Sequence, residues 1–176
     1  MWRFAIPLVT LLILVTFFWR GLYLNPGEVP SPLIGKPAPE FTLPTVRNPD
    51  VTFSHLNLRE QPSIVNIWGT WCVGCRQEHD TLLTLASLTE TPIYGINYKD
   101  DRDSAIEWLE KLGDPYAMSG FDVEGTVSID WGVYGAPETF VLDKDGIIRF
   151  KHIGPLTPEI VQEDILPLLA SLQTGD

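Results

Sequence analysis

The stretch that decides the fold is residues 63–75, SIVNIWGTWCVGC, where an apolar run leads directly into two cysteines. The run Ser63–Trp68 is rich in β-branched residues and predicts a buried strand. Apolar residues recur with helical spacing from residue 82 to residue 88, so a helix is expected to begin near Cys72 and to end near Leu88. Cys72 and Cys75 therefore stand where a strand ends and a helix begins.

Strands and helices alternate on both sides of this stretch. An Asp145-Gly146 pair between two apolar runs indicates a β-hairpin, and Thr157 followed by Pro158 is typical of a helix start. The order predicts an α/β domain with a central mixed sheet flanked by helices, in which the early strands are parallel and the hairpin is antiparallel. Strands are expected at residues 40–43, 51–53, 63–68, 93–97, 139–142 and 147–152, helices at residues 72–88, 103–112 and 157–172, and an irregular segment with one short helical turn at residues 120–132.

The composition excludes several classes of protein. The chain has 176 residues and a mass of 19.8 kDa, which suits one domain. It holds 23 acidic and 12 basic side chains, a net charge of −11, and this argues against nucleic-acid binding because little positive charge is available to neutralise phosphates. Two cysteines are too few for a disulfide-rich secreted scaffold.

The N-terminus is predicted to be a membrane anchor. Residues 4–19, FAIPLVTLLILVTFFW, are uncharged, and continuation to Leu24 gives a helix about 31 Å long, enough to cross the hydrocarbon core. The alternative is a cleaved signal peptide, but no small-x-small cleavage site follows the apolar run. Arg3 and the terminal amine, against the single Arg20, favour a cytoplasmic N-terminus. We therefore expect an uncleaved signal-anchor helix at residues 1–24, a Pro-rich linker at residues 25–34 and one domain at residues 35–176, outside the cytoplasm.

Cys72 and Cys75 have the spacing of a redox-active pair. At the start of a helix, free N–H groups and the helix dipole stabilise a thiolate on Cys72, so its pKa is expected to fall below the usual value of about 8.5. Cys75 can then resolve a mixed disulfide that Cys72 has formed. A structural disulfide, a haem attachment site and a four-ligand zinc site fit less well, the haem site because Arg76 stands where a histidine is required. A copper-binding module that uses Cys72, Cys75 and His79 is an alternative, although we expect His79 on the helix surface.

Three stretches carry a resemblance to a known family: residues 35–41 (GKPAPEF), 68–79 (WGTWCVGCRQEH) and 132–140 (GVYGAPETF). The second resembles the W-x-x-W-C-x-x-C active site of the thioredoxin fold. Together with the apolar N-terminus, the three resemble the membrane-anchored thioredoxin-like proteins of cytochrome c biogenesis, the CcmG/DsbE type. The resemblance covers about residues 33–157, and the third stretch is its most specific part.

The resemblance implies a thiol:disulfide oxidoreductase with a thioredoxin-like fold, anchored in the inner membrane by one span with its domain in the periplasm. A membrane thiol reductase would be the electron donor. Apocytochrome c, or a maturation protein that forms a mixed disulfide with it, would be the electron acceptor. The redox-active disulfide Cys72–Cys75 would serve as the redox centre, so no cofactor and no metal are expected.

The resemblance also implies roles for individual residues. Pro137 aligns with the cis-proline that faces the disulfide in the thioredoxin fold. Asn66 stands where thioredoxin has a buried aspartate, and an amide cannot act as a base. We therefore expect Glu78 or Glu138 to take over proton transfer, and a carboxylate close to Cys72 would raise the pKa of that thiol.

The residues around the dithiol are expected to control which proteins can reach it. Trp71 is expected to shield the disulfide, whereas Trp68 is expected to belong to the core. Residues 122–132 and Tyr134 are expected to line a groove near Pro137 and to select partners.

Two related functions stay open at this point. One is a general extracytoplasmic thioredoxin-like reductase, and the other is a peroxiredoxin-like peroxidase, because the stretch at residues 35–41 also occurs in those relatives. A peroxidase would need a threonine just before its reactive cysteine, and Thr70 stands there. The presence of Cys75 nevertheless argues for dithiol exchange.

Overall fold

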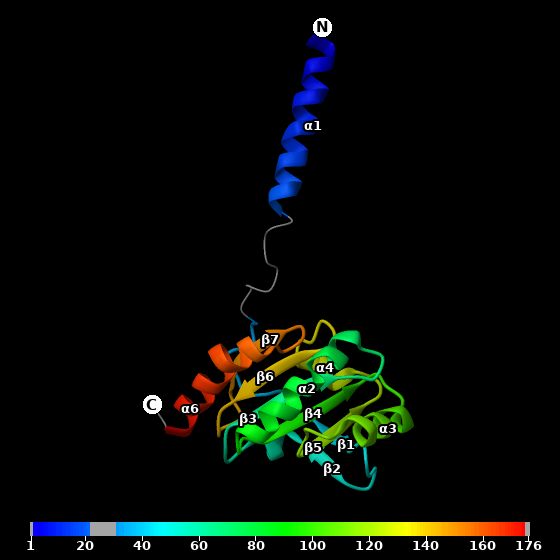
Figure 1. The fold of residues 1–176 in the computed structure, drawn as a ribbon, viewed down its shortest axis with the longest axis vertical. Coiled ribbons are helices and arrows are strands. Elements are labelled where there is room, and N and C mark those ends of the chain that lie inside the picture. Colours follow the sequence, from blue (N-terminus) through cyan, green and yellow to red (C-terminus); the bar gives the residue numbers. More distant parts are fainter. Residues whose placement is uncertain (1, 22–30, 175–176) are drawn as a thin grey trace. The chain divides into compact units, whose positions relative to one another are not determined.

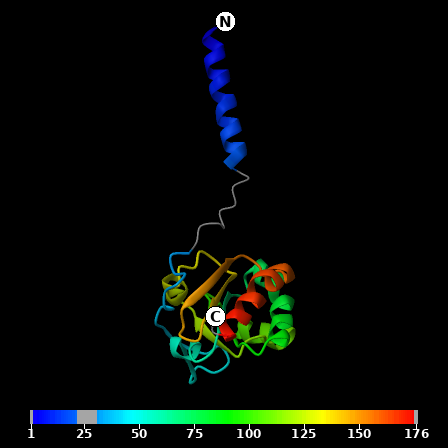
Figure 2. The same ribbon diagram turned by 90° about the vertical axis from the view of Figure 1, so that its left-hand side faces the viewer.

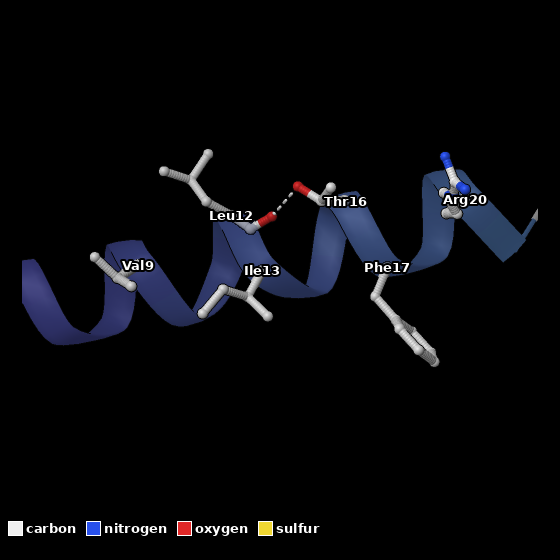
Figure 3. Close-up of a pocket in the computed structure, with 6 residues that line it drawn as sticks. All are labelled: Val9, Leu12, Ile13, Thr16, Phe17 and Arg20. Atoms are coloured by element: carbon white, nitrogen blue, oxygen red, sulfur yellow. Dashed lines mark hydrogen bonds between the residues drawn. The ribbon is translucent and has the colours of Figure 1, made fainter.

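The computed structural model describes residues 2–21 and 31–174, and the chain divides into two units, Met1–Pro30 and Ser31–Asp176. The described part of the first unit is helix α1 (Trp2–Gly21), which contains Pro7. Thr16 donates its hydroxyl back to the carbonyl of Leu12 at 2.7 Å, so its polar group is satisfied within the helix. Figure 3 shows one flank of α1, with side chains projecting outward from Val9, Leu12, Ile13, Thr16, Phe17 and Arg20.

None of the helices in the described part of the chain reaches the length and hydropathy of a membrane span. The anchor expected from the sequence continues to Leu24, and residues 22–24 lie outside the described residues. The expected linker likewise lies mostly outside them.

The second unit is built on one five-stranded mixed sheet with the strand order β5-β4-β3-β6-β7. β3 pairs in parallel with β4 and antiparallel with β6, so it lies at the centre of the sheet. β4 pairs in parallel with β5, and β6 and β7 form the expected antiparallel hairpin (Figure 1). The strands are β3 (Ser63–Trp68), β4 (Ile93–Tyr98), β5 (Met118–Asp122), β6 (Glu138–Leu142) and β7 (Ile148–Ile153).

Helices cover one face of this sheet, and a small hairpin with its neighbours covers the other (Figure 2). The first face carries α2 (Val73–Leu88), α3 (Arg102–Leu112) and a C-terminal helical segment made of α5 (Pro158–Ile160), η3 (Val161–Ile165) and α6 (Leu166–Thr174). The second face carries the hairpin β1 (Thr42–Pro44) and β2 (Thr52–Ser54), the turn η2 (His55–Leu58) and helix α4 (Thr126–Asp130).

The alternation of side chains along β3 divides the core between these two faces. Ile64 and Trp68 pack in the cluster under α2 and α3, whereas Val65 and Ile67 pack in the opposite cluster. Asn66 lies between Ile64 and Trp68 in this alternation, and therefore faces α2. All six residues of β3 are buried, as its apolar run predicts.

Neighbouring segments pair with part of each outer strand of the sheet. Thr45 forms a bridge with Gly120 of β5. At the other edge, the backbone N–H of Gly35 donates to the carbonyl of Ile148 of β7 at 2.8 Å, and Ile148 donates to the carbonyl of Lys36 at 2.9 Å.

The structure corrects two expectations drawn from the sequence. Residues 118–122, expected in part to be irregular, form β5, because their backbone pairs with β4 even though Ser119 and Gly120 do not read as a strand. The last helix is not uniformly α-helical, since the segment Val161–Ile165 is a π-helix. Thr157 caps this helical segment as expected, with Pro158 at its first position.

Candidate active site

The two cysteines form a disulfide at the N-terminus of α2. The S–S bond joins Cys72 and Cys75, whose Cα atoms are 5.3 Å apart. Cys72 is the N-cap of α2, and its Sγ accepts a hydrogen bond from the backbone N–H of Cys75 at 3.0 Å. The same N–H group and the positive end of the helix dipole stabilise a thiolate on Cys72 once the bond is reduced. The cysteines are 5% and 3% exposed, respectively.

Pro137 lies against the turn between the cysteines. The Ala136–Pro137 peptide bond is cis, which confirms the prediction. A Cβ atom placed on Gly74 would lie 2.8 Å from Cδ of Pro137 and 3.1 Å from Cγ of Pro155. The backbone of Gly74 is therefore in direct contact with two proline rings, and residue 74 has no room for a side chain.

An acidic residue after β4 holds the turn that precedes Cys72. The carboxylate of Asp100 accepts hydrogen bonds from the backbone N–H of Thr70 at 2.7 Å and from the Thr70 hydroxyl at 2.6 Å. It also accepts from the side-chain amide of Asn97, which is fully buried, at 2.8 Å. Thr70 is thus fixed by Asp100 from both its backbone and its side chain.

The two tryptophans of the motif have different surroundings. Trp68 is 1% exposed and stacks on Tyr116, so the prediction that it belongs to the core is confirmed. Trp71 is 52% exposed, and its indole N–H donates to the carbonyl of Tyr98 at 3.0 Å. This bond holds the exposed indole of Trp71 beside the end of β4.

Glu78 lies in a buried polar network under α2 rather than on a solvated helix face. Its Oε1 accepts from the amide of Asn66 at 2.8 Å, and its Oε2 accepts from the backbone N–H of Leu156 at 2.8 Å. The Asn66 amide also donates to the hydroxyl of Thr139 at 3.0 Å, and Tyr116 donates to Oδ1 of Asn66 at 2.8 Å.

Burial raises the pKa of Glu78 from 4.5 to about 7, and the hydrogen bonds from Leu156 and Asn66 oppose that rise. A carboxyl group with a pKa near neutrality can give and take a proton at physiological pH. The pKa of Tyr116 is raised well above 10, first by burial and then by the charges of Glu78 and Asp114, so its hydroxyl remains a hydrogen-bond donor.

Glu138 is also fully buried, but it forms an ion pair. Its Oε2 lies 2.8 Å from Nζ of Lys151, whose side chain is 3% exposed. Its Oε1 accepts from the backbone N–H of Tyr134 at 2.8 Å, and Lys151 donates to the carbonyl of Gly132 at 2.8 Å. The pair therefore ties the loop before Pro137 to β7. A direct effect of Glu138 on Cys72 stays a prediction.

The expectation that His79 lies on the helix surface is wrong. His79 is 3% exposed, its Nε2 is 3.1 Å from the carbonyl of Gly113, and its Nδ1 is 3.2 Å from the indole nitrogen of Trp108. A carbonyl only accepts and an indole N–H only donates, so both contacts are satisfied by the neutral ring with its proton on Nε2. Burial, the largest cause, lowers the pKa of His79.

The groove residues expected to select partners are partly exposed. Tyr134 is 83% exposed above Lys151, whose Nζ lies 4.9 Å from the centre of its ring. Val123 and Ile129, from the segment 122–132, are 51% and 59% exposed. Their role in partner selection stays a prediction.

Within the described residues, no three His, Cys, Asp or Glu side chains are grouped so as to hold a metal ion. The copper site considered above needs His79 as a ligand, and both of its nitrogens are engaged with Gly113 and Trp108. The geometry therefore gives the copper-binding alternative no support.

Sequence reasoning did not single out Asp100, Tyr116 or Lys151. A signal existed for Lys151, because the alternation of the predicted hairpin places it on the same face as Glu138. Asp100 also had one, since it follows a strand that neighbours the active-site strand. The sequence held no signal for Tyr116, because this residue precedes β5, the strand that the sequence did not predict.

A disulfide at a helix N-terminus, with a cis-proline just before β6 in contact with the glycine between its cysteines, defines a thiol:disulfide oxidoreductase with a thioredoxin-like fold. The family model Redoxin matches residues 33–166, and together with the relatives described next it shows that the chain belongs to the Redoxin family and, within it, to the DsbE-type thiol:disulfide interchange proteins.

Curated relatives and solved structures agree on this class. The thiol:disulfide interchange protein DsbE of Pseudomonas aeruginosa is 48% identical over 167 residues, which cover 95% of this chain and 92% of that protein. The protein of that name from Escherichia coli K12 is 48% identical over 145 residues, covering 82% and 78%. A secreted thiol-disulfide isomerase from Corynebacterium glutamicum aligns with a TM-score of 0.67 and 26% identity over 76% of this chain and 85% of that one.

Proposed function

We propose that this protein is a membrane-anchored periplasmic reductase that acts in cytochrome c maturation, reducing disulfides of apocytochrome c or of a haem-ligation partner. The observation that carries the proposal is the disulfide at the start of α2, whose intervening Gly74 contacts Pro137 of the stretch GVYGAPETF, residues 132–140. That stretch is the most specific part of the resemblance to the cytochrome c biogenesis proteins.

Reduction of a substrate disulfide proceeds in two exchange steps. The Cys72 thiolate attacks one sulfur of the substrate disulfide, so that a mixed disulfide forms and one substrate thiolate leaves. Cys75 loses its proton and attacks Sγ of Cys72, which releases the second substrate thiolate and restores the Cys72–Cys75 disulfide. Two electrons have then passed to the substrate, and a membrane thiol reductase returns them.

Glu78 is the group we assign to proton transfer in the second step. It stands one turn after Cys75 on α2, is fully buried, and has a pKa of about 7. A group with this pKa takes up the proton that Cys75 must lose at neutral pH. Glu138 lies in an ion pair with Lys151, so we assign it the role of fixing the conformation of the loop before Pro137.

The test is to trap the substrate with Cys75→Ser in cells. This variant cannot resolve the mixed disulfide, so its target should stay linked to Cys72 and be separable only after reduction. Cys72→Ser/Cys75→Ser is the matched control, which should trap nothing. Recovery of apocytochrome c or of a cytochrome c maturation thiol protein supports the proposal, whereas recovery of unrelated proteins alone contradicts it and favours a general reductase.

We propose that residues 1–24 anchor the protein in the inner membrane, with the domain on the periplasmic side. Support comes from the uncharged apolar run at residues 4–19 of the sequence. Protease added to spheroplasts should digest the domain, and alkaline carbonate should leave the chain in the membrane fraction. A protected domain would contradict the orientation, and release by carbonate would contradict the anchor.

A further inference from the structure

Tyr116 is a buried residue of the active-site network to which no role has yet been given. It lies in the segment between α3 and β5 and is 9% exposed. Its hydroxyl donates to Oδ1 of Asn66 at 2.8 Å, and its ring stacks on Trp68, with 5.5 Å between the ring centres. Because the stacking on Trp68 fixes the position of the Tyr116 hydroxyl, the hydrogen bond constrains the orientation of the Asn66 amide.

The Asn66 side chain can enter this network in either of two orientations, which differ by a half-turn of the amide. In the observed orientation, its NH₂ group donates to Glu78 at 2.8 Å and to Thr139 at 3.0 Å, while Oδ1 accepts from Tyr116. Turned over, the amide would present Oδ1 to Glu78. Two acceptor oxygens repel each other unless one of them carries a proton, so the turned amide is compatible only with protonated Glu78.

We propose that Tyr116 is a positioning residue: by donating to Oδ1 of Asn66, it holds the amide with its NH₂ group toward Glu78 and so keeps the proton affinity of this carboxyl group low enough for proton exchange with the dithiol. The inference rests on the role given to Glu78 in the proposed function.

Other charged groups around Glu78 do not supply this effect. Glu138 is paired with Lys151. His79, on the same helix, is held as a neutral ring between Gly113 and Trp108. Asp114 acts on Tyr116 itself, since its charge adds to burial and to the charge of Glu78 in raising the pKa of the phenol. The hydrogen bond from Asn66 is the one side-chain bond that lowers the pKa of Glu78, and burial is what raises it.

The experiment follows the protonation of Glu78 directly, through the infrared carbonyl band of its protonated carboxyl group in the oxidised full-length protein in detergent. Glu78→Gln identifies the band by its disappearance. In Tyr116→Phe, the midpoint of the titration should rise by about one pH unit, because one hydrogen bond that orients the amide is lost. Tyr94→Phe is the control, since Tyr94 stacks on Phe53 within the opposite core cluster, and its midpoint should match the wild type.

A second background tests whether Tyr116 acts through Asn66. Asn66→Leu should by itself raise the midpoint, and adding Tyr116→Phe should then produce no further shift. An unchanged midpoint in Tyr116→Phe, or an equal shift in both backgrounds, would overturn the proposal. If Tyr116→Phe does not fold, 3-fluorotyrosine at position 116 replaces it: the stronger donor should lower the midpoint, and an unchanged midpoint would overturn the proposal.

Failure of this inference can be told apart from failure of the proposed function. The titration midpoint is read without any substrate, so it judges Tyr116 whichever proteins Cys75→Ser traps in cells. Conversely, if Glu78→Gln exchanges thiols at the wild-type rate across the pH range, the role of Glu78 fails, while the midpoint of the band still reports on Tyr116.

Discussion

Gly74 and Pro137 touch across the active site, with 2.8 Å between Cδ of Pro137 and the place where a Cβ atom of Gly74 would lie. One residue belongs to the first turn of α2 and the other to the loop before β6, so the contact joins the helix that carries the dithiol to the loop that carries the cis-proline. Close approach of the two backbones requires a residue without a side chain at position 74.

Gly74→Ala should therefore disturb both stability and exchange. The added methyl group meets proline rings, which cannot rotate away, so we expect a cost of up to about 3 kcal/mol. This cost outweighs the roughly 1 kcal/mol that alanine gains over glycine within a helix. Denaturant unfolding and the rate of thiol–disulfide exchange measure the two effects. Gly135→Ala is the control, because a Cβ atom at Gly135 meets nothing within 4 Å. Equal behaviour of the two variants would contradict the prediction.

Glu78 should make the protein less stable as the pH rises. Its pKa is about 7 in the folded state and 4.5 as a free group, so between these values the unfolded chain loses a proton that the folded chain keeps. The contribution of Glu78 to the free energy of unfolding is fully present below pH 4.5 and is lost as the pH rises through 7. At about 1.4 kcal/mol per unit, the loss is roughly 3 kcal/mol.

Denaturant unfolding of the oxidised protein at pH 4 and at pH 8 tests this. The free energy of unfolding of Glu78→Gln should depend less on pH than that of the wild type. The stability of the variant relative to the wild type should therefore increase from pH 4 to pH 8. Parallel pH profiles for the two proteins would show that Glu78 titrates normally.

Removal of one partner of the Glu138–Lys151 pair should be costly. Lys151→Met leaves a buried carboxylate without its cation, which we expect to destabilise the protein by about 3–5 kcal/mol. Lys151→Met/Glu138→Gln should recover part of that loss, because no buried charge remains. A double-mutant cycle of unfolding free energies measures the coupling, and additive effects would mean that the two side chains do not interact.

Asp100→Ala should loosen the turn that precedes Cys72. The change removes the acceptor of both Thr70 hydrogen bonds and of the bond from buried Asn97, so we expect a loss of roughly 2 kcal/mol or more. The exchange rate should fall several-fold, because Cys72 is then less well positioned. Glu110→Ala removes an exposed acid near the end of α3 and should change neither quantity. Wild-type kinetics in Asp100→Ala would show that the turn keeps its shape without this carboxylate.

The sequence predicted the elements whose pattern is local. Ser63–Trp68 forms a strand because its side chains are apolar on both faces, and the cysteines could be placed because the helix after them is periodic. β5 could not be predicted, since its residues Ser119 and Gly120 do not favour a strand, and pairing with β4 decides its conformation. Local propensity is a weak guide where tertiary contacts of this kind intervene.

The site was predictable in its reactive groups and less so in their surroundings. Cys72, Cys75 and Pro137 lie together in the structure as the motif implies. The burial of Glu78 and His79 depends on which face of α2 meets the sheet and α3, and the spacing of polar residues does not reveal this. The network of Tyr116 with Asn66 joins residues 50 positions apart, which only the assembled fold brings together.

The short pairings along the two outer strands have a further consequence for the protein in a crowded compartment. An open strand edge is a template for another chain, and proteins that expose long edges tend to aggregate. Here Thr45 blocks part of β5, and residues 35–36 block the start of β7. Two copies of the domain therefore have fewer free backbone groups through which their sheets could pair with each other.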